Sequence, residues 1–229
     1  MRTVGVEILE DCDHVSTVYV PIGGGGLISG VGAAVKRMRP GVRIVGVEPE
    51  GGAAMAASIT VGKPVTLERV KRVADGLLPV RPGDLTFTHV TEFVDDVITV
   101  KDEDIIKAVQ WLMTTAKLVV EPSGAATVAA VLFQSGGAQL AHQGVTVAVL
   151  SGGNIAIEIL VSLYPGAARV NSEQLLCSRE CFGNRGYFAI QLPVINLLQH
   201  VAKLRTWGDT QPDQMSAHQN WVWRGVFYP

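Results

Sequence analysis

The sequence has little cysteine and few aromatic residues. Of its 229 residues, three are cysteines (Cys12, Cys177 and Cys181) and 6% are aromatic. A small, odd number of cysteines argues against a disulfide-stabilised secreted scaffold and is typical of a reducing compartment. We therefore expect a cytoplasmic protein.

Clusters of like charge and long apolar runs are also missing. The formal net charge is -2 and no basic cluster occurs, which argues against a nucleic-acid partner. Proline and glycine interrupt the apolar runs before they reach the length of a membrane-spanning helix. The first eleven residues include three acidic ones, where a signal peptide needs an apolar segment. We expect neither a membrane nor a nucleic acid as partner.

Aliphatic residues and glycine are abundant, and their pattern alternates between strands and helices. Hydrophobic residues make up 48% of the chain, which also contains 25 glycines. We expect strands at 15–22, 43–47, 96–100 and 144–150, and helices at 3–11, 27–38, 51–61, 85–93, 101–117, 123–133 and from after 154 to about 163. Such alternation is typical of an α/β fold: a three-layer, open, mainly parallel sheet with helices on both faces.

The helix expected at 101–117 has the clearest amphipathic pattern. Asp102 is a candidate N-cap. Its predicted apolar face consists of Ile105, Ile106, Val109, Leu112, Met113 and Ala116.

The last part of the chain differs in character. Residues 169–229 contain three of the four tryptophans, Trp207, Trp221 and Trp223, and lose the strand–helix alternation. We therefore expect two parts, an α/β portion at 1–168 and a tail at 169–229 of a different kind.

Four consecutive glycines, Gly23, Gly24, Gly25 and Gly26, join the first expected strand to the next helix. Without side chains, their N–H groups can converge on an anion at the positive end of that helix. This tetraglycine loop (residues 23–26) predicts a phosphate site, and a plain tight turn is the alternative. A dinucleotide site is a second alternative. It needs G-x-G-x-x-G, in which the third glycine would be Ser29 here, although Glu48 lies where an acidic ribose ligand belongs.

A second glycine-rich segment, Ser151-Gly152-Gly153-Asn154, follows the strand expected at 144–150. Ligands of open α/β sheets bind at the carboxyl ends of the strands. This serine-glycine loop (residues 151–154) offers one hydroxyl and enough space for a flat ring. The two loops therefore predict one crevice, although a helix start capped by Ser151 would also explain the second.

Five motifs occur in the order GGGGL, VGVEPEG, VADG, KLVVEPSGA and LSGGN. In this order they resemble the pyridoxal-phosphate enzymes of the tryptophan-synthase-β fold, and most of all the threonine/serine dehydratases and serine racemase. The resemblance covers residues 1–159 and implies pyridoxal 5'-phosphate as cofactor. The cofactor-binding residues that it implies are Gly23, Gly24, Gly25, Gly26, Leu27, Gly76, Glu121, Ser151 and Gly152.

The resemblance also implies a role for each part of this set. The tetraglycine loop would bind the cofactor phosphate through N–H groups, and Ser151 would hydrogen-bond the pyridine nitrogen. Gly76 would lie against the ring, with Glu121 near its side. Each has a structural alternative: Gly76 as a plain turn glycine, and Glu121 as a solvated acid before Pro122 at the first position of a helix.

Glu48 resembles a divalent-metal ligand of serine racemase. The second carboxylate of that site would fall on Ala54, so we expect no metal site of that kind.

The chemistry of the family needs a lysine that forms a Schiff base with the cofactor. The family pattern, which resembles S-x-K-x-R-G-A, does not occur in this sequence. The family's small domain, with its loop for the substrate carboxylate, has no counterpart either. We therefore expect a truncated product that is inactive alone, with no catalytic residue of its own.

By resemblance, the whole protein would be an ammonia-lyase. It would convert hydroxy-amino acids of the serine/threonine type to a 2-oxo acid and ammonia by β-elimination, and it would form a homodimer. Two alternatives remain. One is a non-catalytic, cofactor-binding fragment that pairs with a full-length homologue. The other is an NAD-type dinucleotide-binding domain.

Overall fold

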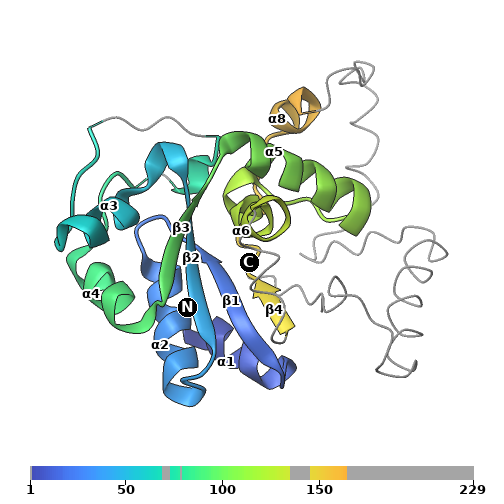
Figure 1. Ribbon diagram of the computed structural model, residues 1–229. Helices are drawn as coiled ribbons and strands as arrows, with labels where there is room; N and C mark the ends of the chain where they lie inside the picture. Colours follow the sequence, from blue (N-terminus) through green and yellow to red (C-terminus); the bar gives the residue numbers. More distant parts are fainter. Residues whose placement is uncertain (1, 69–72, 78, 135–144, 164–229) are drawn as a thin grey trace, which may run out of the picture. The chain divides into compact units, whose positions relative to one another are not determined.

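The computed structural model describes residues 2–68, 73–77, 79–134 and 145–163 (Figure 1). The tail expected at 169–229, with two of the three cysteines and three of the tryptophans, lies outside the described residues. None of the helices in the described part of the chain combines the length and the hydrophobicity that a membrane-spanning segment needs.

The described residues form a parallel sheet of four strands. In chain order these are β1 (Val15–Pro21), β2 (Arg43–Pro49), β3 (Asp96–Val100) and β4 (Val145–Ala148). The spatial order is β3-β2-β1-β4, and each neighbouring pair is parallel. The α/β fold expected from the sequence is confirmed, and the observed strands lie close to their predicted bounds.

Helices cover both faces of the sheet (Figure 1). One face carries α1 (Arg2–Asp11), α2 (Gly26–Met38) and α4 (Asp84–Phe93), and the other carries α5 (Asp102–Trp111) and α6 (Pro122–Phe133). Shorter elements complete the described chain: η1 (Glu50–Gly52), α3 (Ala54–Val61), η2 (Asp75–Leu77), η3 (Leu112–Ala116) and α8 (Ile157–Ser162).

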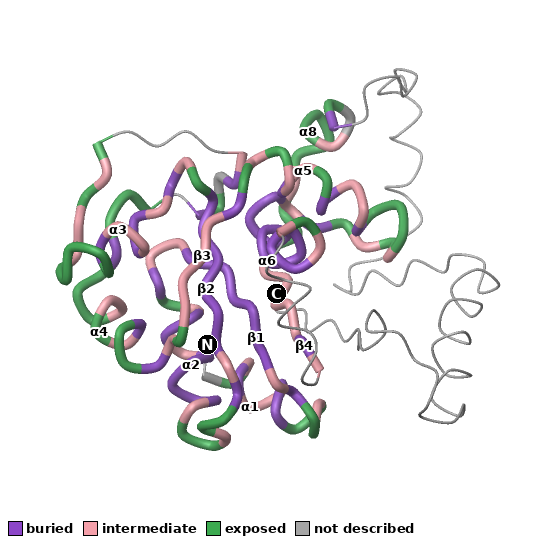
Figure 2. Tube along the Cα trace, viewed as in Figure 1, coloured by how far each residue is buried: buried purple, intermediate pink, exposed green. Residues whose placement is uncertain are grey.

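The core lies between β1 and the helices on each side (Figure 2). Val18 and Val20 of β1 pack with Ile28 and Val31 of α2 in one cluster of buried aliphatic side chains. On the other face, α6 is buried from Pro122 to Val131 and is rich in alanine. A helix that is apolar all round belongs in the interior, which is why α6 can lie directly on the sheet.

The helix expected at 101–117 is the main difference from prediction. Regular α-helix ends at Trp111, and η3 continues it as a π-helical turn up to Lys117, whose φ is 60°. A π turn holds more residues than an α turn and rotates the side chains that follow it. Met113, predicted to be apolar core, is accordingly 37% exposed.

The cap predicted for this helix is also wrong. Lys101 occupies the N-cap position and makes no side-chain capping bond. Asp102 instead accepts a hydrogen bond from the Val73 N–H at 3.2 Å. Its carboxylate therefore holds the segment that precedes η2, a tertiary contact that the helix pattern could not reveal.

Candidate active site

The two glycine-rich loops lie at the same edge of the sheet. From β1 the chain moves outward to β2 and β3, then returns to pair β4 with the other side of β1. The Val149 N–H, just after β4, donates to the Tyr19 carbonyl of β1 at 2.9 Å. The order of the strands reverses between β1 and β4, and such a switch point is where open α/β sheets bind their ligands.

The tetraglycine loop has the backbone expected of an anion cradle. Gly25, the N-cap of α2, is left-handed with φ 88°. Among the residues that the structure describes, no backbone acceptor is found for the N–H groups of Gly23, Gly24, Gly25 and Gly26. The same holds for Leu27, in the first turn of α2. These donors lie at the positive end of the α2 dipole, so the loop fits a phosphate group.

The space behind the loop is closed by side chains. A Cβ on Gly25 would lie 2.8 Å from Met55 Cε and 2.9 Å from Thr86 Oγ1. On the neighbouring side, a Cβ on Gly23 would lie 3.4 Å from the Leu77 Cα of η2. The loop therefore has room for a ligand only on the side that these residues leave open.

The serine-glycine loop contains a hydroxyl group and a glycine with positive φ. Ser151 is half-buried, and its hydroxyl makes no hydrogen bond to another described residue. Gly152 has φ 99°, and its carbonyl accepts the Glu121 N–H at 3.2 Å. The helix after this loop, α8, begins only at Ile157. Capping of a helix start therefore does not explain Ser151.

Glu121 joins the serine-glycine loop to Gly76. Its Oε2 accepts the Asn154 N–H at 3.1 Å. A Cβ on Gly76 would lie 2.7 Å from Glu121 Oε1, and a Cβ on Gly152 would collide with the same carboxyl group. Glu121 is also the N-cap residue of α6, with Pro122 after it; the alternative expected this helix start, but with a solvated carboxylate. Its position serves the helix and also places a carboxylate between two of the predicted ring contacts.

A buried hydroxyl group holds the backbone of Gly76 in place. The Gly76 N–H donates to Ser123 Oγ at 2.8 Å, and Ser123 is 2% exposed. Because η2 also lies against Gly23 through Leu77, the turn links the tetraglycine loop to Glu121 and Gly152. The structure thus brings together the residues predicted for phosphate, ring face and ring edge.

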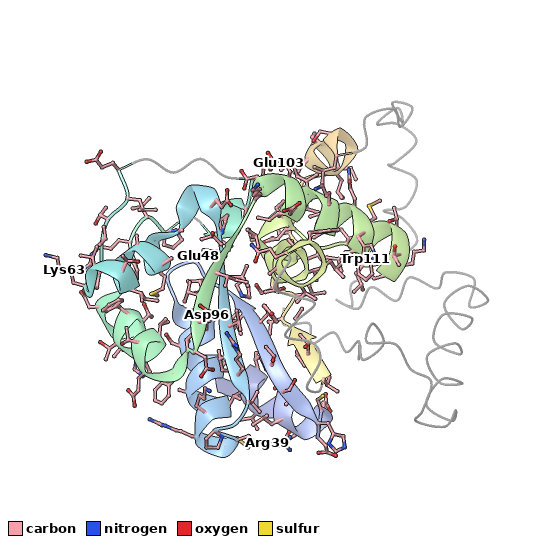
Figure 3. The ribbon with its side chains drawn as sticks, viewed as in Figure 1. Arg39, Glu48, Lys63, Asp96, Glu103 and Trp111 are labelled. Carbon is pink, nitrogen blue, oxygen red and sulfur yellow. The ribbon has the colours of Figure 1, made fainter. Side chains whose placement is uncertain are left out.

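The Glu48 carboxylate makes hydrogen bonds to the backbone of α3. Glu48 is 1% exposed, and its two carboxylate oxygens accept the N–H groups of Met55 and Ala56, each at 2.8 Å (Figure 3). It therefore caps the first turn of α3. Both oxygens already accept one N–H group, and the side chain is buried, so little of this carboxylate is accessible to a ribose hydroxyl or a metal ion. Among the described residues, no group of three or more histidine, cysteine, aspartate or glutamate side chains could hold a metal ion.

Three residues around the site were not anticipated from the sequence: Met55, Thr86 and Ser123. Each lies on a helix and next to a glycine that is distant along the chain. Such contacts depend on helix packing and leave no local pattern. Only Ser123 had a signal in the sequence, its place in the motif KLVVEPSGA.

Two glycine-rich loops at one switch point are an arrangement that fits a phosphorylated ring cofactor. Residues 1–152 match the family model described as pyridoxal-phosphate dependent enzyme, and the chain belongs to this family. The resemblance stated from the sequence motifs and the cofactor expected for the family are both confirmed.

Individual relatives agree with this assignment. The L-threonine ammonia-lyase of Thermotoga maritima is 44% identical over 159 residues, which are 69% of this chain and 38% of that protein. The serine racemase of Oryza sativa subsp. japonica is 41% identical over 167 residues, 71% of this chain and 48% of that protein. The chain spans half or less of the length of these curated relatives.

Solved structures show the same fold. Maize serine racemase matches with a TM-score of 0.66 and 39% identity, covering 70% of this chain and 49% of that chain. The processed form of threonine deaminase isoform 2 from Solanum lycopersicum matches with a TM-score of 0.64 and 32% identity, covering 71% of this chain and 47% of that chain.

The contact between Glu121 and Gly152 predicts a specific loss of stability. We expect Gly152→Ala to lower the free energy of unfolding by about 2 kcal/mol, because alanine disfavours positive φ and its Cβ collides with Glu121. Urea denaturation measures this. The matched control is Gly153→Ala, whose Cβ would meet only Val119 O among the described atoms, at 3.5 Å. Equal effects of the two substitutions would contradict the geometry described here.

Proposed function

We propose that this chain forms the cofactor-binding part of a pyridoxal-phosphate-dependent ammonia-lyase that acts on hydroxy-amino acids of the serine/threonine type. One observation carries the proposal: β1 and β4 are adjacent and parallel, so the tetraglycine and serine-glycine loops share one edge. The names of the relatives, threonine ammonia-lyase and serine racemase, support this class of substrate. The homodimer expected from the resemblance remains a prediction.

In this proposal each loop does one task. The N–H groups of Gly23 to Gly26, with that of Leu27, hold the cofactor phosphate. The Ser151 hydroxyl hydrogen-bonds the pyridine nitrogen, and Gly152 and Gly76 leave room for the ring beside Glu121. When bound, pyridoxal phosphate supplies an electron sink for a carbanion at the substrate α-carbon. Ser151 is neutral and does not enforce a positive charge on the ring nitrogen, which suits the elimination of a β-hydroxyl.

Covalent attachment of the cofactor is not expected of these residues. The chain has seven lysines, none in the pattern that the resemblance associates with the Schiff base: Lys36, Lys63, Lys71, Lys101, Lys107, Lys117 and Lys203. We therefore propose that the 229 residues bind the cofactor without covalent attachment and do not catalyse elimination by themselves. A binding half that pairs with a full-length homologue is the second candidate, and the same absence of a suitable lysine favours it.

Calorimetric titration tests the proposal. We expect pyridoxal phosphate to bind about tenfold or more tightly than pyridoxal, which lacks the phosphate, because the tetraglycine loop binds only that group. NAD serves as the competing ligand. If NAD binds instead, and Glu48→Ala abolishes its binding, the proposal is wrong and the site belongs to a dinucleotide.

The role of Ser151 can be tested separately. We expect Ser151→Ala to weaken the binding of pyridoxal phosphate and of pyridoxal alike by about fivefold, because one hydrogen bond to the ring nitrogen, worth about 1 kcal/mol, is lost. The control is Ser162→Ala, since the hydroxyl of Ser162 donates to the Ile159 carbonyl on the exposed side of α8. Unchanged affinity in Ser151→Ala would remove Ser151 from the site.

A further inference from the structure

The carbonyl of Gly24 is held by the start of α4. Thr86 Oγ1 donates to Gly24 O at 2.6 Å, and the Gly83 N–H approaches the same oxygen at 3.5 Å. Thr86 Oγ1 also lies 3.0 Å from the Gly83 carbonyl. A hydroxyl has one proton to donate, and the shorter distance assigns it to Gly24. A side chain 62 positions away along the chain therefore fixes one peptide of the tetraglycine loop.

The direction of that carbonyl determines the direction of an N–H group. The peptide between Gly24 and Gly25 is trans, and in a planar trans peptide the C=O and the following N–H point in opposite directions. Because Gly24 O points toward Thr86, the Gly25 N–H points away from α4, to the open side of the loop. Thr86 thus sets the direction of the Gly25 N–H group without itself lying on the open side of the loop.

A glycine–glycine peptide needs such a restraint. Without a Cβ on either side, it can rotate by a half turn at little steric cost. The rotated peptide would present its carbonyl oxygen to the phosphate, where two negative groups repel each other. The hydrogen bond to the Gly24 carbonyl disfavours the rotated peptide in the free protein. The loop is therefore preorganised, and binding costs less conformational entropy.

Helix α4 is held against α2, and this contact fixes the position of Thr86 relative to the tetraglycine loop. Ser29 Oγ of α2 donates to the Thr86 carbonyl at 3.3 Å, and Ser29 is 8% exposed. Farther along, a Cβ on Gly32 would lie 3.2 Å from the Phe93 carbonyl, so the two helices lie in close contact. Ser29 occupies the position where a dinucleotide fingerprint needs its third glycine. Here its hydroxyl binds α4.

We infer that Thr86 is a positioning residue of the phosphate cradle, whose hydroxyl orients the Gly24–Gly25 peptide so that the Gly25 N–H donates to the cofactor phosphate. This inference rests on the proposed function, because it presumes that the tetraglycine loop binds the phosphate of pyridoxal phosphate. It assigns no contact between Thr86 and the cofactor.

The test compares two ligands that differ only in the phosphate. Thr86→Val keeps the shape of the side chain and removes the hydroxyl. We expect it to weaken the binding of pyridoxal phosphate about tenfold or more and to leave the binding of pyridoxal unchanged. Thr86→Ser, which keeps the hydroxyl, stays within about threefold of the wild type. Thr88→Val is the matched control, because Thr88 Oγ1 donates to the Asp84 carbonyl of the same helix.

The outcomes separate this inference from the proposed function. If the wild type does not prefer pyridoxal phosphate to pyridoxal, the proposed function fails and the inference fails with it. If the wild type has that preference and Thr86→Val keeps it, only the inference is overturned. An equal loss for both ligands also overturns it, since that indicates a general structural role. If Thr86→Val does not fold, Thr86→Ala also removes the hydroxyl and has a smaller side chain to accommodate. The ratio of its affinities for pyridoxal phosphate and for pyridoxal then decides the outcome in the same way.

Discussion

We expect Gly25→Ala to abolish the preference of the chain for pyridoxal phosphate over pyridoxal, which weakens pyridoxal-phosphate binding by about tenfold or more, or about 1.4 kcal/mol or more. Gly25 has φ 88°, which an alanine disfavours by about 1–2 kcal/mol. Its Cβ would also lie 2.8 Å from Met55 Cε and 2.9 Å from Thr86 Cβ. The terminal methyl of Met55 can move aside, but Thr86 Cβ is attached directly to the backbone of α4, so the loop must shift and its N–H groups then no longer converge.

The control for this substitution is Gly41→Ala. Gly41 lies between α2 and β2, has no positive φ and has no described atom within 4 Å of the Cβ that would be added. Calorimetric titration of both variants with the two ligands measures the effect. A Gly25→Ala protein that is folded and binds pyridoxal phosphate like the wild type would show that the tetraglycine loop is only a turn.

Glu48→Ala is expected to lower the free energy of unfolding by about 3 kcal/mol. The substitution removes a buried carboxylate and leaves the N–H groups of Met55 and Ala56 without their acceptors, and hydrogen bonds to a charged group are each worth about 1.5–3 kcal/mol. The loss would be a large part of the stability of a typical domain, which is about 5–15 kcal/mol. Urea denaturation at constant pH measures it.

Glu50→Ala is the matched control, because Glu50 is an exposed acid two residues further along the chain. We expect it to change stability by no more than about 0.5 kcal/mol. If both variants are equally stable, Glu48 does not hold α3. If added Mg²⁺ raises the unfolding midpoint of the wild type and not that of Glu48→Ala, the carboxylate is a metal ligand, and its role as a cap is secondary.

The elements of the fold could be predicted from the sequence because their signals are local. The β-branched run VSTVYV and the strand at 96–100 have the composition of buried strands, and the glycines that follow Ile22 end β1 sharply. The pairing of β1 with β4 has no such signal. These two strands are far apart along the chain, so only the tertiary structure shows that they are neighbours.

The site was predictable only in part, for a related reason. The two loops could be placed at one edge because parallel strands end on the same side of a sheet. The motif order then indicated Gly76 and Glu121, and in the structure the Glu121 carboxyl group lies against both Gly76 and Gly152. The hydrogen bonds of Glu48 to α3 and of Thr86 to Gly24 could not be predicted, because each depends on how a helix packs against the rest of the fold. The sequence singled out Glu48 only as a candidate ribose or metal ligand, and nothing in the local sequence distinguishes Thr86 from a surface position.

The most direct test is a crystal structure of the chain with pyridoxal phosphate bound. We expect phosphate oxygens at about 3 Å from the N–H groups of Gly24, Gly25 and Gly26, with the pyridine nitrogen at a similar distance from Ser151 Oγ. A phosphate bound elsewhere, or a ring that reaches only one of the two loops, would contradict the proposal that both loops bind one cofactor.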